Sequence, residues 1–157
     1  MTGMTDRLKE KDAIRDVLQR AGRLLDCEAF SDWVELFAQD ASYEVRAYST
    51  EIGVEMEWMK LNREELKALL EQVSEHVRDL GRHLHLISPV SIEITDKQAS
   101  ALSSFAIYRT TQDGVTHCYA VGHYEDTLVE KAGAWRFLAR TVRLHTRVLE
   151  VATHVPF

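Results

Sequence analysis

One aspartate and one histidine have the side-chain types and placement best suited to acid–base chemistry. Asp26 falls near the end of a predicted first helix, and His85 falls early in a predicted long strand. A carboxylate that hydrogen-bonds an imidazole fixes its tautomer and raises its basicity, so that His85 would serve as a general base in a closed pocket. Alternatively, Asp26 caps or bonds locally and His85 is a satisfied core histidine. The sequence alone favours this structural alternative.

The seven histidines also raise the question of a metal site. His83 and His85 are two residues apart, which places both imidazoles on one face of a strand. A ferrous oxygenase site needs two histidines and a carboxylate around open positions, and the other histidines form no recognisable ligand motif. A Rieske cluster needs Cys-x-His pairs, but Cys27 is followed by Glu-Ala and Cys118 by Tyr-Ala. We therefore predict neither a metal nor a cofactor in this chain.

Composition narrows the class of protein further. The 157 residues fit one domain, 1–157, and the 45% apolar content is that of a compact globule. The net charge of -6 is opposite in sign to the basic footprint of a nucleic-acid binder. No nucleophile elbow or glycine-rich phosphate loop occurs. We predict no nucleic-acid partner and no nucleophilic catalysis.

The N-terminus and the cysteines indicate the cellular compartment. The first residues are charged and lack the apolar core of a signal peptide, and no apolar run approaches the ~20 residues needed to cross a bilayer. Cys27 and Cys118 lie inside a predicted helix and strand, which is typical of two buried free thiols in a reducing compartment. The expectation is a cytoplasmic protein with no membrane partner.

The first half of the chain is predicted to be mainly helical. Apolar residues recur at three- and four-residue spacing from Leu8 to Leu25, behind a possible cap at Thr5. Asn62 and Glu65 form a capping-box pattern ahead of a further helix. The expected elements are a long first helix, a short helix after Ser31, a strand over residues 41–48 and a third helix over residues 63–80.

The second half alternates apolar and polar residues with period two, which indicates strands. Short turns make consecutive strands hairpin neighbours. Leu86 and Ile92 are expected on one face of the first strand, with His83 and His85 on the other. Both faces are partly apolar, so another subunit is a candidate cover for one of them. The predicted strands span residues 83–95, 99–110, 116–130 and 134–151, and the fold class is α+β with a curved antiparallel sheet around helices.

Charged residues gather at two places in the sequence. Glu51, Glu55 and Glu57 precede the third helix, and four arginines follow one another along the last strand. These arginines form either intersubunit ion pairs or a solvated face. They are Arg136, Arg140, Arg143 and Arg147.

Several stretches that together cover most of the chain carry a family likeness. The most characteristic are VGHYEDTL at 121–128 and WRFLARTV at 135–142, and the others are LLD at 24–26, WVELF at 33–37, AYSTEI at 47–52 and MEW at 56–58. The chain resembles the β subunits of Rieske-type aromatic-ring-hydroxylating dioxygenases and related sulfonate monooxygenases. These subunits are part of the NTF2-like (SnoaL-like) superfamily.

The resemblance implies an NTF2-like cone and a small, non-catalytic subunit. It implies a homotrimer through the sheet face, bound to three oxygenase α subunits as α3β3. The Rieske [2Fe-2S] cluster and the mononuclear iron would then belong to the α subunit. The process served would be the catabolism of aromatic or sulfonated compounds.

A second likeness comes from the same fold. SnoaL-like and scytalone-dehydratase-like enzymes resemble this chain in having an aspartate late in the first helix and a histidine early in the next long strand. Asp26 and His85 match those positions, which implies a cofactor-free dehydratase or isomerase as the alternative function. The candidate pocket residues in this fold are Tyr43, His83, Ile87 and Tyr124.

Overall fold

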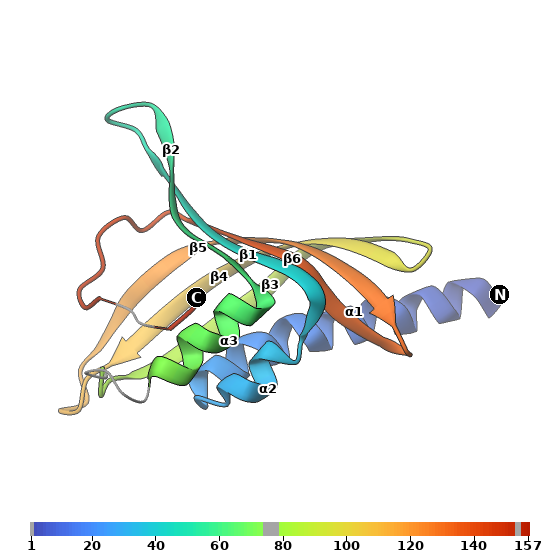
Figure 1. The fold of residues 1–157 in the computed structure, drawn as a ribbon, viewed down its shortest axis with the longest axis horizontal. Helices are drawn as coiled ribbons and strands as arrows, with labels where there is room; N and C mark the ends of the chain where they lie inside the picture. The colour runs from blue at the N-terminus through green and yellow to red at the C-terminus, as the bar shows by residue number, and fades with distance from the viewer. Residues whose placement is uncertain (1, 74–78, 153–154) are drawn as a thin grey trace.

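A six-stranded curved sheet forms the centre of the computed structural model, which describes residues 2–73, 79–152 and 155–157 (Figure 1). The strand order is β2-β1-β6-β5-β4-β3. β1 and β6 are parallel and all other neighbours are antiparallel, which confirms the predicted α+β class with a curved sheet. The strands are β1 (Phe37–Ser49), β2 (Val54–Asn62), β3 (Arg82–Thr95), β4 (Gln98–Thr110), β5 (Thr116–Lys131) and β6 (Ala134–Leu144).

The helices lie together on one side of this sheet (Figure 1). α1 (Thr2–Asp26) packs on β3, and Ile14, Leu18 and Ala21 are fully buried on its inner side. α2 is short (Phe30–Val34). α3 (Arg63–Gln72) begins with the predicted capping box. The predicted extension to residue 80 was wrong at its end, because Asp79 and Leu80 are not helical; residues 74–78 lie outside the described part.

One strand, β2, was not predicted from the sequence. β2 pairs with β1 through a turn at residues 50–53, where Gly53 adopts φ +63°. The two strands slip by one residue beside Trp58, because Val45 pairs with Met59 while Arg46 pairs with Glu57. This bulge breaks the simple alternation that marks a strand in a sequence. At the other end of the chain, the predicted last strand stops at Leu144 rather than at residue 151.

A second bulge corrects the predicted faces of β3. Pro89 pairs with Ser103 and Ser91 pairs with Leu102, which leaves Val90 without a partner. A one-residue slip moves every later side chain to the opposite face. Leu86 therefore points outward and is half exposed, whereas Ile92 is buried, so the two do not share a face as expected.

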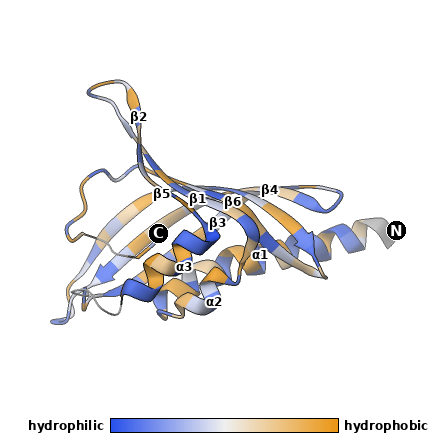
Figure 2. Cartoon of the chain, in the orientation of Figure 1, coloured by the Kyte–Doolittle hydropathy of each residue, from blue (hydrophilic) through white to orange (hydrophobic). Residues whose placement is uncertain are grey.

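The core contains an aromatic cluster, while the thiols lie outside it. The rings of Trp33 and Phe37 are 4.7 Å apart and Tyr43 lies edge-on to both. Figure 2 shows apolar and polar residues alternating along the strands, as a half-buried sheet requires. The prediction of buried cysteines was wrong, because Cys27 and Cys118 are both exposed.

Candidate functional site

Asp26 and His85 form a hydrogen-bonded pair between α1 and β3. Asp26 is the last residue of α1 and His85 lies in β3, on the face turned toward that helix. The Oδ1 atom of Asp26 is 2.5 Å from His85 Nδ1, and Oδ2 accepts the backbone N–H of His85 at 2.9 Å. The two bonds fix both the carboxylate and the imidazole.

A glycine allows this helix and strand to approach each other. A Cβ atom on Gly22 of α1 would lie 2.7 Å from Ile87 Cδ1 and 2.9 Å from His85 Cβ. Any other residue at this position would push the helix away from β3. Gly22 therefore sets the separation at which Asp26, one helical turn later, meets His85.

The second ring nitrogen of His85, Nε2, differs from Nδ1 in its hydrogen bonding. The His85 side chain is 4% exposed, and Nε2 has no hydrogen-bond partner among the residues that the structure describes. In the neutral imidazole whose Nδ1–H donates to Asp26, Nε2 carries a free lone pair. A buried acceptor without a partner has a free-energy cost that a hydrogen-bonding ligand would remove.

A cavity of about 300 Å³ adjoins this imidazole. Its wall combines apolar groups such as Ile107 and Phe157 with the polar groups of Asp26, His83 and Tyr119. Mixed walls of this kind suit a small, largely apolar molecule with one or two polar atoms. Chemically, the pair and the cavity together can bind a hydrogen-bond donor or take up a proton.

The rim of the cavity holds a second polar cluster that the sequence did not reveal. Asp79 accepts two hydrogen bonds from Arg109, both at 2.6 Å, and its Oδ2 atom is 3.6 Å from His83 Nε2. The hydrogen bonds from Arg109 hold the pKa of Asp79 at about 2. Burial lowers the pKa of His83, although the Asp79 carboxylate opposes this shift. His83 is thereby favoured in its neutral form.

The other predicted pocket residues lie away from this cavity. Tyr43 and Tyr124 are fully buried, and burial raises the pKa of both phenols above the ordinary value. Tyr43 Oη accepts the Phe157 N–H at 2.9 Å and lies 3.2 Å from the Phe157 carbonyl oxygen, to which it donates. Ile87 packs against Gly22. Of the predicted set, the structure brings His83, His85 and Asp26 together.

Contacts between residues far apart in sequence explain what the sequence missed. Arg109 reaches Asp79 because β4 pairs with β3, which sets Arg109 opposite His83. Phe157 reaches the cavity because Tyr43 binds its backbone. Neither contact leaves a periodic or spaced pattern in the chain.

The residues that the structure describes do not fit a Rieske cluster or a mononuclear iron. Both cysteines are exposed, they lie in separate elements, and neither begins a Cys-x-His pair. Within residues 2–73, 79–152 and 155–157, no three His, Cys, Asp or Glu side chains are grouped as metal ligands. In the same part of the chain, no helix is long and apolar enough to span a membrane.

Comparison with known proteins identifies the family. A model of the SnoaL-like domain matches residues 6–141. The chain is 32% identical to the β subunit of 2-aminobenzenesulfonate 2,3-dioxygenase from Alcaligenes sp, over 92% of this chain and 97% of that protein. This chain belongs to the SnoaL-like domain family, in the branch of oxygenase β subunits.

Two further similarities agree with that assignment. The hydroxylase β subunit of methanesulfonate monooxygenase from Methylosulfonomonas methylovora is 30% identical, over 92% of this chain and 86% of that protein. The solved structure of a candidate aromatic-ring-hydroxylating dioxygenase β subunit from Novosphingobium aromaticivorans superposes with a TM-score of 0.81, at 26% identity over 93% and 94% of the two chains. The SnoaL-like family and the oxygenase β-subunit resemblance predicted from the sequence are confirmed.

Proposed function

We propose that this chain is the small, structural subunit of a cytoplasmic Rieske non-haem iron oxygenase that acts on aromatic or sulfonated compounds. The observation that carries the proposal is near full-length similarity to two β subunits of sulfonate oxygenases. The match extends over 92% of the chain, whereas the Asp26–His85 pair accounts for two residues. The chain acts as one domain over its 157 residues.

The redox centres belong, in this proposal, to a large α subunit. The Rieske [2Fe-2S] cluster would transfer electrons and the mononuclear iron would activate oxygen there. The missing Cys-x-His pairs of this chain are consistent with that division of labour. The β chain forms a homotrimer through its outer sheet face and supports three α subunits as α3β3.

Reconstitution tests the proposal. The chain is expressed alone, the Rieske α subunit encoded in the same genome is expressed alone, and the two are also expressed together. We expect an equimolar complex that hydroxylates its substrate, while the β chain alone does not. If the chain formed no complex with that subunit, or hydroxylated substrate without it, the structural-subunit assignment would be wrong.

The geometry of the Asp26–His85 pair supports a second candidate function. The buried Nε2 lone pair beside a cavity is the arrangement of a general base for elimination or isomerisation. In this candidate the chain acts without metal on a small apolar molecule inside the cone. Variants of the pair separate the two functions, as set out in the Discussion.

A further inference from the structure

The cavity beside His85 has a wall of aromatic rings. The ring centroids of His83 and Tyr119 are 5.1 Å apart with the rings edge to face, and the Tyr119 ring stacks on Phe157 at 6.5 Å. All three rings line the cavity, as does Ile107. An apolar cavity of about 150 Å³ is enough to hold a benzene ring, and this cavity has about 300 Å³. The space and the ring contacts therefore suit a substituted aromatic ring.

The buried polar atom in this wall is a hydrogen-bond acceptor. Nε2 of His85 has no partner among the residues that the structure describes, and the side chain is 4% exposed. In the neutral ring whose Nδ1–H donates to Asp26, Nε2 carries only a lone pair. A ligand with an O–H or N–H group would remove the cost of this unpaired acceptor. A neutral donor suits the site better than an ammonium ion, whose charge would lose its hydration there.

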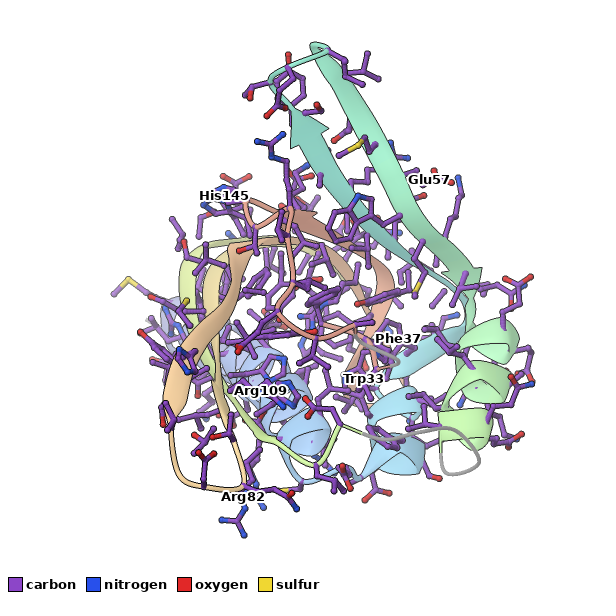
Figure 3. All side chains as sticks on the ribbon, turned by 90° about the vertical axis from the view of Figure 1, so that its left-hand side faces the viewer. Trp33, Phe37, Glu57, Arg82, Arg109 and His145 are labelled. Carbon is purple, nitrogen blue, oxygen red and sulfur yellow. The ribbon has the colours of Figure 1, made fainter. Side chains whose placement is uncertain are left out.

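The charges around the cavity disfavour anions. The wall includes the carboxylates of Asp26, Glu28 and Asp79. Arg109 donates two hydrogen bonds of 2.6 Å to Asp79, so its charge is already compensated. The Arg82 side chain is exposed, and Figure 3 shows it pointing away from the rest of the molecule. A sulfonate or carboxylate group inside the cavity would therefore meet like charges, which repel.

We propose that this cavity binds a neutral phenol, whose hydroxyl group donates a hydrogen bond to Nε2 of His85. An aromatic ring without a hydroxyl group leaves that nitrogen without a partner, so the site selects hydroxylated rings over unhydroxylated ones. Ring hydroxylation converts the second class of molecule into the first. The cavity is thus a product-binding site of the oxygenase, and the inference rests on the proposed function for this identification alone. Binding needs no proton transfer, so it is compatible with a non-catalytic subunit.

The variant Asp26→Asn tests the bond by reversing the tautomer of His85. Oδ2 of Asp26 accepts the backbone N–H of His85 at 2.9 Å, and Oδ1 faces Nδ1 at 2.5 Å. In the variant the amide oxygen keeps the backbone bond, and the amide NH₂ group faces Nδ1. Nδ1 then accepts a hydrogen bond, so the ring proton moves to Nε2, which becomes a donor. The preference of the cavity should therefore change from a hydroxyl group to a carbonyl group.

Isothermal titration calorimetry on the chain alone measures this change. The ligands are phenol, toluene, which has no hydrogen-bonding group, and acetophenone, which only accepts. We expect Asp26→Asn to weaken phenol binding about tenfold, to leave toluene binding within about twofold of wild type and to tighten acetophenone binding. Phenol and toluene weakened equally, an unchanged affinity for phenol, or no binding of phenol to the wild-type chain overturns the proposal.

A control variant uses a histidine away from the cavity. The His123 ring lies 4.7 Å from the His145 ring, between centroids, and His123 is not part of the cavity wall that the described residues form. His123→Phe should bind phenol as the wild-type chain does. A loss of phenol binding in this variant would place the phenol elsewhere and overturn the assignment to His85. Circular dichroism checks that both variants are folded.

Nitrogen NMR on the wild-type chain, labelled with ¹⁵N-histidine, tests the same bond without any variant. The Nε2 resonance of His85 should move upfield when phenol is added, because a nitrogen lone pair that accepts a hydrogen bond becomes more shielded. Toluene and benzenesulfonate should leave this resonance in place, and the His123 resonances serve as an internal control. Phenol that binds without changing the Nε2 resonance of His85 overturns the proposal.

The outcomes also separate this site from the structural-subunit function. Both binding measurements use the chain alone, whereas the function is tested by reconstitution with the α subunit. If phenol binds at His85 and no α subunit binds the chain, the site stands and the structural-subunit function fails. If the reconstituted complex hydroxylates its substrate and phenol does not bind at His85, the function stands and the site is wrong.

Discussion

Arg140 donates two hydrogen bonds to Asp126, at 2.8 and 2.9 Å, in the interior of the cone. The residues are direct neighbours on β6 and β5, and their side chains are at most 1% exposed. The Arg140 guanidinium also lies 4.2 Å from the ring centroids of Tyr124 and Phe137. For Arg140, this placement corrects the expectation of a solvated or intersubunit arginine, whereas the Arg143 side chain is 41% exposed. Burial raises the pKa of Asp126, and Arg140 opposes that shift.

Neutralising one member of this pair should destabilise the fold severely. Asp126→Asn leaves a buried guanidinium without a counter-charge, which costs about 3–5 kcal/mol of unfolding free energy. Urea denaturation measures the loss. The double variant Asp126→Leu/Arg140→Met removes both charges, so it should be less destabilised than Asp126→Asn. Equal losses in the two variants would show that the pair is not held as ions.

The Asp79–Arg109 pair at the cavity rim should make stability depend on acid pH. The pKa of the Asp79 carboxyl group, about 2, lies below the ordinary 3.8. The carboxylate therefore stabilises the fold fully above about pH 4. Between pH 4 and 2 the unfolded chain binds the proton first, and the contribution is lost. Asp79→Asn should therefore cost about 1–2 kcal/mol at pH 7 and much less near pH 2.

Urea unfolding at several pH values measures this difference between wild type and variant. Asp12→Asn is a suitable control, because Asp12 pairs with Arg15 on an exposed part of α1 and should contribute little at any pH. A stability difference for Asp79→Asn that stayed constant from pH 6 to 2 would contradict the assigned ion pair.

The purified chain should contain no stoichiometric iron. It lacks both the Cys-x-His pairs of a Rieske cluster and a grouped set of iron ligands in its described part. Elemental analysis after chelation measures the bound metal, with the reconstituted complex of α and β subunits as the positive control. Retention of about one iron per β chain would overturn the division of labour between the subunits.

Local sequence patterns predicted the elements that obey one regular period. The α1 stripe, the capping box of α3 and the four long hairpin strands follow from spacing alone. The bonded Asp26–His85 pair was one of two alternatives, and the sequence alone favoured the other, in which Asp26 bonds locally. The failures share a physical cause. Bulges at Trp58 and Val90 change the register, so β2 was missed and Ile92 was assigned to the wrong face.

Ion pairs between residues on different strands were likewise not predicted from the sequence. Arg140 and Asp126 are 14 residues apart, and the carboxylate that neutralises the arginine is placed by strand pairing. The Arg143–Glu55 and Arg147–Glu51 pairs join two charge clusters that the sequence showed separately. The parallel pairing of β1 with β6, which no short turn predicts, places these clusters near each other.

The Asp26–His85 pair separates the two candidate functions. In a structural subunit His85 has no proton to move, so His85→Ala and Asp26→Asn should leave the activity of the reconstituted oxygenase within about several-fold of wild type. In a dehydratase or isomerase, loss of the general base should lower the rate of the chain alone by on the order of a hundredfold, with fold and assembly intact. We expect the small effects.

The matched control is His83→Ala, which removes the other cavity imidazole but leaves the bonds between Asp26 and His85 untouched. Turnover is measured twice: on the oxygenase substrate with the α subunit present, and on small hydroxylated or halogenated cyclic compounds with it absent. Small effects are expected because the buried Asp26–His85 hydrogen bonds also join α1 to β3. This structural role does not require the pair to take part in catalysis. A hundredfold loss confined to well-folded His85→Ala, measured without the α subunit, would instead establish the enzyme function.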